Sequence, residues 1–444
     1  MRKLNAYLGI VAFGGICLLF SSAGCRQYQE PPALTRTDIS HVIGQMTELM
    51  IHDVTNPPLA ARFFSYACLA GYEIVSENDT RYKSMHGVLN NYPDLHAPDT
   101  IKGYSYRLAA VLAMIQTAKK MEPSGSRLGP YEQSFLDSCR KIGYTEPVIS
   151  ASQQYALAVS KKILAYAKAD GYNKISNMPR YTPIDEPGHW YPTPPAYMAA
   201  VEPWFKAVRS FTLDSSTQFR PVRPIPFSKD PHSAFYKLLM MNYKDSLTAE
   251  HRAIAGFWDC NPFAVQDNGH LLVGLKKISP GAHWLGITGI ACEKTGKSFE
   301  GSMLVYSLVS IGLMDSFIGC WDEKYGSNRI RPETAIRQLI DPSWAPLLQT
   351  PPFPEYLSGH SCISATSATI LTWYFGDNFQ YTDSVEVHYG LAPRHFGSFQ
   401  QAAQEAGISR FYGGIHFMDA IDNGRELGLK VGQNLIKKMP NLPR

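Results

Sequence analysis

Apolar residues recur at the spacing of an α-helix along most of the chain, and almost no stretch alternates apolar and polar residues as a half-buried strand would. This pattern constrains the fold strongly, because it leaves little from which to build a sheet. Helices are predicted over residues 39–54, 59–75, 104–120, 150–169, 233–243, 247–258, 269–277, 284–292, 302–320 and 361–369. The predicted fold class is all-α.

Prolines and aromatic residues crowd the region between Tyr172 and Pro231, which includes Trp190 and Trp204. The region is too aromatic for a flexible linker, so we predict an ordered crossover between two helical bundles. Residues 25–231 would form the N-terminal bundle and the crossover. Residues 232–444 would form a catalytic C-terminal bundle.

The composition excludes some classes of protein. A hydrophobic content of 45% with 18% charged residues is that of a folded globular protein, and 444 residues suffice for a substantial core. The formal net charge of +4, with no Lys/Arg cluster, does not suit a nucleic-acid-binding protein. The sequence indicates no oligomeric state.

The N-terminus has the pattern of a targeting segment. Arg2 and Lys3 precede an apolar run over residues 8–20, which is too short for a stable membrane span. Small residues then precede Cys25, which resembles a bacterial lipoprotein signal, although Ser22 stands where a leucine is usual. Residues 1–24 would be the signal peptide and Cys25 the lipidated residue. We expect export and a lipid anchor on a bacterial membrane, in the periplasm or facing the surface, with plain secretion as the alternative.

The cysteines after Cys25 are widely spaced and form no Cys-x-x-Cys pair or zinc motif. We predict buried, unpaired cysteines rather than disulfides. His283, in Pro-Gly-Ala-His-Trp, is typical of a structural histidine more than of a ligand. Residues 291–298 nearly match a phosphate-binding loop, but its first glycine is missing, so that reading is rejected.

Three short segments carry side chains suited to chemistry. In the first, Lys324 and Arg331 lie seven residues apart, which is two turns of a helix, so both are predicted to point the same way. Pro332 is predicted to end or turn that helix. On its own, this segment could equally be a solvated basic helix end.

The second segment is a proline-rich approach, residues 351–357, followed by Ser358, Gly359 and His360. Ser358 is predicted at the N-cap of the next helix. A helix N-terminus offers unpaired amide donors and a partial positive charge, which suits an oxyanion. His360 would then be placed to exchange a proton with whatever the anion is bonded to.

The third segment contains Arg410, a Gly413-Gly414 pair and His416. The glycines would let the backbone approach a ligand or a neighbouring helix and bring Arg410 and His416 to one site. Together the three segments supply one lysine, two arginines, a helix N-terminus and two histidines. That set suits a tetrahedral or trigonal-bipyramidal oxyanion, with arginine forks on its oxygens. One histidine would bond to the central atom while the other manages protons.

In order and spacing, these segments resemble the K-x6-R-P, S-G-H and S-R-x5-H signature of the superfamily that joins vanadium-dependent haloperoxidases and type 2 phosphatidic acid phosphatases. The resemblance implies a fold of two helical bundles. It also implies that His416 is the covalent or coordinating histidine and His360 the general acid–base. The oxyanion-binding residues that it implies are Lys324, Arg331, Ser358, Gly359 and Arg410.

Other positions resemble the chloroperoxidase-like branch. Trp321 and Phe353 match side chains that line the vanadate pocket there, and Asp259 matches an acidic partner of an active-site arginine. Two positions depart from the family pattern. Leu357 stands where proline is frequent before S-G-H, and Ala420 stands where an aspartate usually supports the final histidine. Whether a neighbour replaces that aspartate is left open between Asp419 and Asp422.

The resemblance implies two reactions for one pocket. In a haloperoxidase, vanadate on His416 would be the cofactor and halide and hydrogen peroxide the substrates, with Lys324 polarising the peroxide and His360 shuttling protons. In a soluble phosphatase, which needs no cofactor, a phosphoester would form phosphohistidine on His416 and vanadate would only inhibit. A non-catalytic anion-binding lipoprotein is the third hypothesis. Trp321 and Phe353 favour the haloperoxidase.

Overall fold

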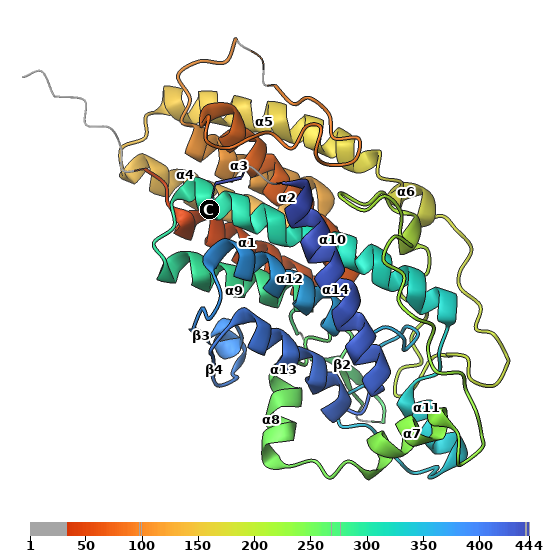
Figure 1. The fold of residues 1–444 in the computed structure, drawn as a ribbon. Coiled ribbons are helices and arrows are strands. Elements are labelled where there is room, and N and C mark those ends of the chain that lie inside the picture. Colours follow the sequence, from red (N-terminus) through yellow and green to blue (C-terminus); the bar gives the residue numbers. More distant parts are fainter. Residues whose placement is uncertain are drawn as a thin grey trace, which may run out of the picture.

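The computed structural model describes residues 33–439, except 97, 99, 268 and 276, together with residues 442–443. The predicted signal peptide and Cys25 lie outside these residues, so export and lipidation stay predictions. The predicted all-α class is confirmed, because the regular elements are helices apart from two small antiparallel hairpins (Figure 1).

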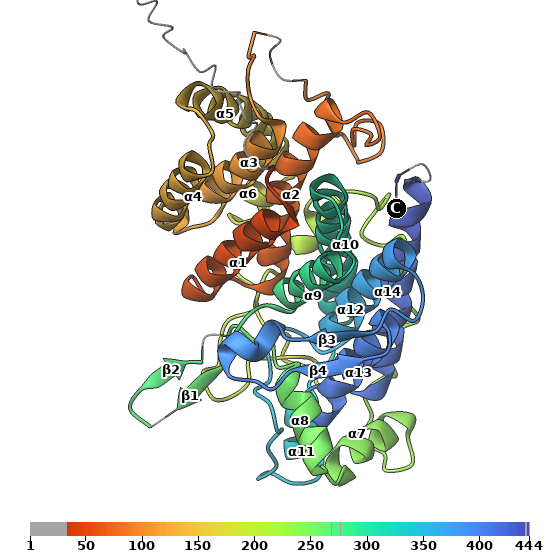
Figure 2. The same cartoon turned by 90° about the vertical axis from the view of Figure 1, so that its left-hand side faces the viewer.

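The N-terminal helices pack around one another and against one face of the rest of the molecule (Figure 2). They are α1 (Arg36–His52), α2 (Pro57–Asn78), α3 (Tyr106–Met121), η1 (Gly125–Leu128), α4 (Gly129–Lys141) and α5 (Glu146–Lys168). The remaining helices are α6 (Tyr172–Ile175), η2 (Phe205–Ala207), α7 (Ala234–Lys244), α8 (Ala249–Phe257), α9 (Pro280–Lys294), α10 (Phe299–Ser327), α11 (Pro332–Leu339), α12 (Gly359–Phe375), η3 (Val385–Tyr389), α13 (Phe399–Tyr412) and α14 (Met418–Lys438).

Helix α10 is the central element of both groups. It packs against α2 on one side and against α12 and α14 on the other (Figure 2). Its most apolar window is long and hydrophobic enough to cross a membrane, yet that window is 100% buried inside the molecule. This is the burial of a core helix, as the sequence predicted. Helix α10 follows residue 231 in the sequence but packs against helices from both sides of that boundary. The division of the chain into two bundles at residue 231 therefore stays a prediction.

The crossover between the bundles is ordered, as predicted. Trp190 is 1% exposed, and its amide donates to the Asn328 carbonyl at 2.8 Å. The Val201 carbonyl accepts from Trp321 Nε1 at 3.2 Å and from the Tyr325 hydroxyl at 2.6 Å. The crossover therefore packs along the C-terminal end of α10, where the first of the three segments begins.

One predicted helix is wrong. Residues 269–277 were expected to be helical, but Val265–Asp267 (β1) pairs antiparallel with Leu272–Gly274 (β2). Gly269 has φ +80°, and its amide donates to the Asp267 carboxylate at 2.7 Å, which favours a turn. The short apolar run does not pack into the core, because Leu272 and Val273 are exposed. The other short hairpin joins β3 (Tyr381–Asp383) to β4 (Arg394–Phe396).

The six cysteines of the described residues are buried and unpaired, which confirms that prediction.

Candidate active site

The first segment is not one continuous helix, which corrects a prediction. Helix α10 ends at Ser327, and Asn328 takes a left-handed conformation with φ +50°. Arg331 is the N-cap of α11, and Pro332 begins that helix rather than ending one. A proline fits the first turn of a helix because the amide it lacks would have no intrahelical partner there. Lys324 and Arg331 thus reach the site from opposite sides of a turn.

The second segment contains the predicted helix cap. Ser358 is the N-cap of α12, and its Oγ accepts from the Ser361 amide at 3.3 Å and the Ser361 hydroxyl at 2.9 Å. Gly359 and His360 form the first turn of that helix. The N-terminus of α12 therefore lies at the site, as the sequence predicted.

The third segment brings His416 into the site through its glycine pair. Gly414 has φ +74°, and a Cβ on Gly413 would lie 2.7 Å from a methyl carbon of Leu348. The chain thus passes close to the loop that contains Leu348. His416 then lies two residues before the start of α14.

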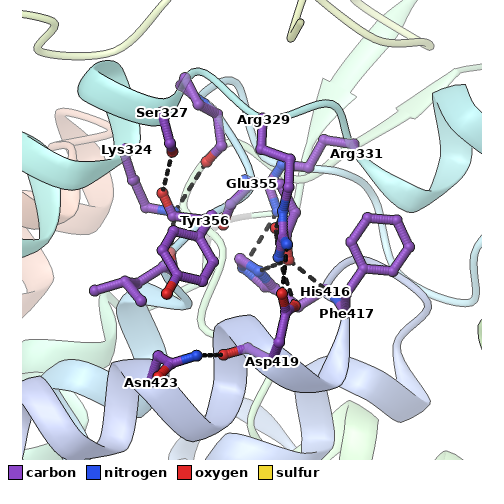
Figure 3. A network of polar contacts seen from close by, with 12 residues as sticks. Lys324, Ser327, Arg329, Arg331, Glu355, Tyr356, His416, Phe417, Asp419 and Asn423 are labelled. Carbon is purple, nitrogen blue, oxygen red and sulfur yellow. Dashed lines mark hydrogen bonds and ion pairs between the residues drawn. The ribbon is translucent and has the colours of Figure 1, made fainter. Parts of the chain in front are cut away.

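The ring of His416 is fixed at both nitrogens (Figure 3). Nδ1 lies 2.9 Å from Glu355 Oε1, and Nε2 lies 3.2 Å from Arg331 Nη1. Because a carboxylate only accepts and a guanidinium only donates, Nδ1 carries the proton and Nε2 presents a lone pair. Burial, then the charges of Arg331 and Lys324, hold the pKa of His416 well below its usual value. His416 is therefore a neutral imidazole with Nε2 as its acceptor.

Glu355 is a site residue that the sequence reasoning missed. Besides His416, its Oε1 accepts from the Phe417 amide at 2.9 Å, and its Oε2 accepts from Arg329 Nε at 2.6 Å. Arg329 forms a second, bidentate pair with Asp419 at 2.6 and 2.7 Å (Figure 3). The direct support of His416 is thus Glu355, with Asp419 two contacts further away, beyond Arg329.

This network shows which acidic residue supports His416 in place of the aspartate that Ala420 replaces. Asp419 acts on His416 only through Arg329 and Glu355, while Asp422 is exposed on α14. A signal existed in the sequence, because Glu355 is the acidic residue in the run between Pro351 and Ser358. A charged residue in so apolar a run needs a buried partner.

Each of the two arginines of the site has one buried nitrogen that donates to no described residue. Arg331 Nε donates to the Phe353 carbonyl at 3.0 Å and Nη1 to the Ile415 carbonyl at 2.8 Å, while its buried Nη2 has no partner among the described residues. Arg410 Nη1 donates to the Trp258 carbonyl, and within the same part of the chain its buried Nε has no partner. Buried donors are usually satisfied, so these groups point to an anion.

Asp259 lies beside Arg410, where the sequence predicted an acidic partner. Its Oδ1 is 3.6 Å from Arg410 Nη2, and its Oδ2 accepts from Lys277. Burial lowers the pKa of Arg410 and, to about 10, that of Arg331. A pKa of about 10 leaves the Arg331 guanidinium charged at neutral pH.

Lys324 is engaged differently from the arginines. Its Nζ donates to the carbonyls of Pro354 at 2.9 Å, Glu355 at 3.1 Å and Leu357. An ammonium has three hydrogens, so its donors are used to hold this loop. Burial lowers the pKa of Lys324 to about 8. Lys324 thus contributes positive charge near His416, while its predicted bond to the oxyanion stays a prediction.

His360 lines the same cavity as His416, beside Arg410 and the Trp258 backbone. Its Nε2 is 3.4 Å from Arg410 Nη1. Burial, then the charges of Arg410 and His416, hold the pKa of His360 well below its usual value. A neutral imidazole beside an anion site can accept a proton.

A small cavity joins these groups. Trp321 and Phe353 line it with their ring centroids 5.1 Å apart, and Phe353 also lies under the Arg331 guanidinium at 5.1 Å. The residues of the three segments that share this lining are Trp321, Pro351, Phe353, Gly359, His360, Arg410, Ile415 and His416. Both histidines and both predicted aromatic residues thus meet at one cavity.

Comparison with solved structures finds a bacterial vanadium-dependent iodoperoxidase with 43% sequence identity and a TM-score of 0.87, covering 93% of this chain and 98% of that one. The chain belongs to the vanadium-dependent haloperoxidase family. It is therefore an enzyme of that family. The family model of the VCPO second helical-bundle domain matches residues 304–443, which contain all three segments.

More distant structures show the same fold. The holo form of a bacterial vanadium-dependent chloroperoxidase has 15% identity and a TM-score of 0.62, covering 88% of this chain and 94% of that one. The apo form of a bacterial vanadium-dependent chloroperoxidase has 16% identity and a TM-score of 0.63, covering 87% and 96%. A search of curated proteins finds no match.

Proposed function

We propose that this haloperoxidase oxidises a halide with hydrogen peroxide, using vanadate held at His416. The observation that carries the proposal is the His416 ring, whose Nε2 lone pair faces a buried guanidinium while Glu355 holds the proton on Nδ1. A neutral imidazole nitrogen with its tautomer fixed by a carboxylate is a competent ligand.

The donor set around this nitrogen fits vanadate. The unpaired Nη2 of Arg331 and Nε of Arg410 supply buried positive donors for anionic oxygens. The first turn of α12, with Gly359, adds amide donors and the positive end of the helix dipole. Vanadate bound there supplies a Lewis-acidic centre that activates peroxide.

The remaining residues position and charge the site. His360 accepts and returns the proton that peroxide must lose, because its neutral ring lies at the cavity beside Arg410. Lys324 adds fixed positive charge and holds the loop that contains Glu355. Phe353 covers Arg331 and, together with Trp321, Lys324 with apolar surface, which strengthens the charge interactions by excluding water.

Iodide is the halide to test first, because the similar solved structure is that of an iodoperoxidase. The experiment measures iodide, bromide and chloride oxidation by purified protein with peroxide, with and without added vanadate. We expect iodide turnover that requires vanadate and is abolished in His416→Ala. His232→Ala, which removes an exposed histidine, is the matched control and should keep full activity.

Phosphomonoester hydrolysis without vanadate is measured on the same samples, because the same residues would serve a phosphatase. Hydrolysis that vanadate abolishes, without halide turnover, would replace the haloperoxidase proposal by the phosphatase.

A further inference from the structure

We propose that the chain has a second metal site, for a divalent cation of the zinc class, built by Cys260, His283 and Glu386. Cys260 Sγ, His283 Nδ1 and a Glu386 carboxylate oxygen all lie within 4.8 Å of one another. Thiolate, imidazole and carboxylate are the three ligand types that zinc takes in proteins. Cys260 also lines the active-site cavity, but none of the three groups is among the residues proposed to bind vanadate.

The spacing of the donor atoms fits a tetrahedral metal. Zinc bonds of about 2.3 Å to sulfur and about 2.0 Å to nitrogen and oxygen place the S–N, S–O and N–O pairs about 3.5, 3.5 and 3.3 Å apart at tetrahedral angles. The structure has 3.5 Å from Cys260 Sγ to His283 Nδ1, 3.6 Å from Sγ to Glu386 Oε1, and 3.4 Å from Nδ1 to Oε1. A direct N–H···O hydrogen bond would draw the last pair to about 2.9 Å.

The second nitrogen of His283 has the partner that a metal-bound histidine needs. Its Nε2 lies 2.8 Å from Asp383 Oδ2, and both side chains are completely buried. A carboxylate on the far nitrogen fixes the tautomer with Nδ1 free to bind a metal and raises the basicity of the ring. Asp383 is therefore a positioning residue for the proposed site.

The site would join segments that are distant in sequence. Cys260 follows α8, His283 lies in the first turn of α9, and Glu386 lies in η3. His283 and Glu386 follow Cys260 by 23 and 126 residues. A search for a short zinc motif in the sequence therefore does not find this set of ligands. His283, predicted to be structural, is thus the central ligand of this proposal.

The location links the proposed metal to the vanadate site. Trp258 stacks on His283 with ring centroids 4.7 Å apart, and its carbonyl accepts from Arg410. Asp259, next to Cys260, pairs with Arg410. A metal at Cys260 would fix the backbone that positions Arg410. Glu386 also lines a separate cavity with Asp259 and Lys277, which gives a route for a cation.

The test is a titration of the purified full-length protein, stripped of metal with a chelator, with Co²⁺ followed by absorption spectroscopy. Cobalt stands in for zinc and reports a thiolate ligand by an intense near-ultraviolet charge-transfer band. We expect this band to saturate at one equivalent and to be displaced by Zn²⁺. Cys260→Ser should lose the band, and Asp383→Asn should keep it with about 10–100-fold weaker binding.

Cys292→Ser is the matched control, because Cys292 is a fully buried free cysteine of the same helix that carries His283. It should leave both the band and the affinity unchanged. Circular dichroism establishes that each variant is folded. Should Cys260→Ser not fold, X-ray absorption of cobalt bound to the unaltered protein decides, with one sulfur at about 2.3 Å expected. The absence of a charge-transfer band, or a coordination shell without sulfur, would overturn the proposal.

Discussion

Burial lowers the pKa of both histidines of the active site, but the surroundings of the two rings differ. His416 is held through Nδ1 by Glu355, which is held in turn by Arg329 and Asp419. His360 approaches Arg410 at 3.4 Å, and no carboxylate of the described residues pairs with its ring. A histidine whose tautomer is fixed by a carboxylate suits a ligand, and one whose ring meets only a guanidinium and the Trp258 backbone suits proton exchange. The difference in support, rather than in the direction of the pKa shift, distinguishes the two proposed roles.

The largest effect that this comparison predicts is on turnover in His360→Ala. Removal of a positioned acid–base group should lower kcat by about 10²–10⁴-fold, while vanadate affinity stays within a few-fold of the unaltered protein. Steady-state halide oxidation at saturating vanadate measures the first and equilibrium dialysis the second. A large loss of affinity with unchanged kcat at saturation would reverse the assignment.

Glu355→Gln should affect binding more than turnover. The amide cannot replace the charge that both holds His416 and pairs with Arg329, so vanadate affinity should fall about 10–100-fold. The free energy of unfolding should fall by about 2 kcal/mol, because hydrogen bonds between charged groups are weakened. Denaturant unfolding measures this change. Glu426→Gln, which affects only an exposed pair with Lys430, is the control and should cost less than about 0.5 kcal/mol.

A Glu355→Gln variant with unchanged vanadate affinity would mean that the tautomer of His416 does not depend on this carboxylate.

Asp419→Asn should have the smallest effect of the three. Asp419 contacts Arg329 rather than His416, and its side chain is 14% exposed, so vanadate affinity should fall less than about tenfold. Asp422→Asn, on the same helix but exposed, should change nothing. The dialysis assay ranks the two variants. A larger loss of vanadate affinity in Asp419→Asn than in Glu355→Gln would show that His416 is not supported mainly by Glu355.

Much of the fold followed from the sequence, because helical periodicity and caps are local properties. The helix over 361–369 and its cap at Ser358 were predicted from their own residues, and the structure has both. The hairpin at 265–274 was missed because an exposed apolar run looks like a buried one in sequence. The turn at Asn328 was missed because a seven-residue spacing fits a helix as well as a helix end.

The site was only partly predictable, because its support is a tertiary property. The segments with Lys324, His360 and His416 stand out by composition, and the structure brings them together. Glu355 and Arg329 lie inside two of these segments, but their pairing depends on how the segments meet. Periodicity and spacing do not encode which carboxylate reaches which histidine.

The most direct test of the account is vanadate binding by two variants measured side by side. Equilibrium dialysis of His416→Ala and His360→Ala, both confirmed as folded, separates the ligand from the proton-transfer residue without relying on turnover. The account predicts that His416→Ala loses at least about 100-fold in affinity while His360→Ala stays within a few-fold. Retained binding in His416→Ala, or equal losses in both variants, would contradict it.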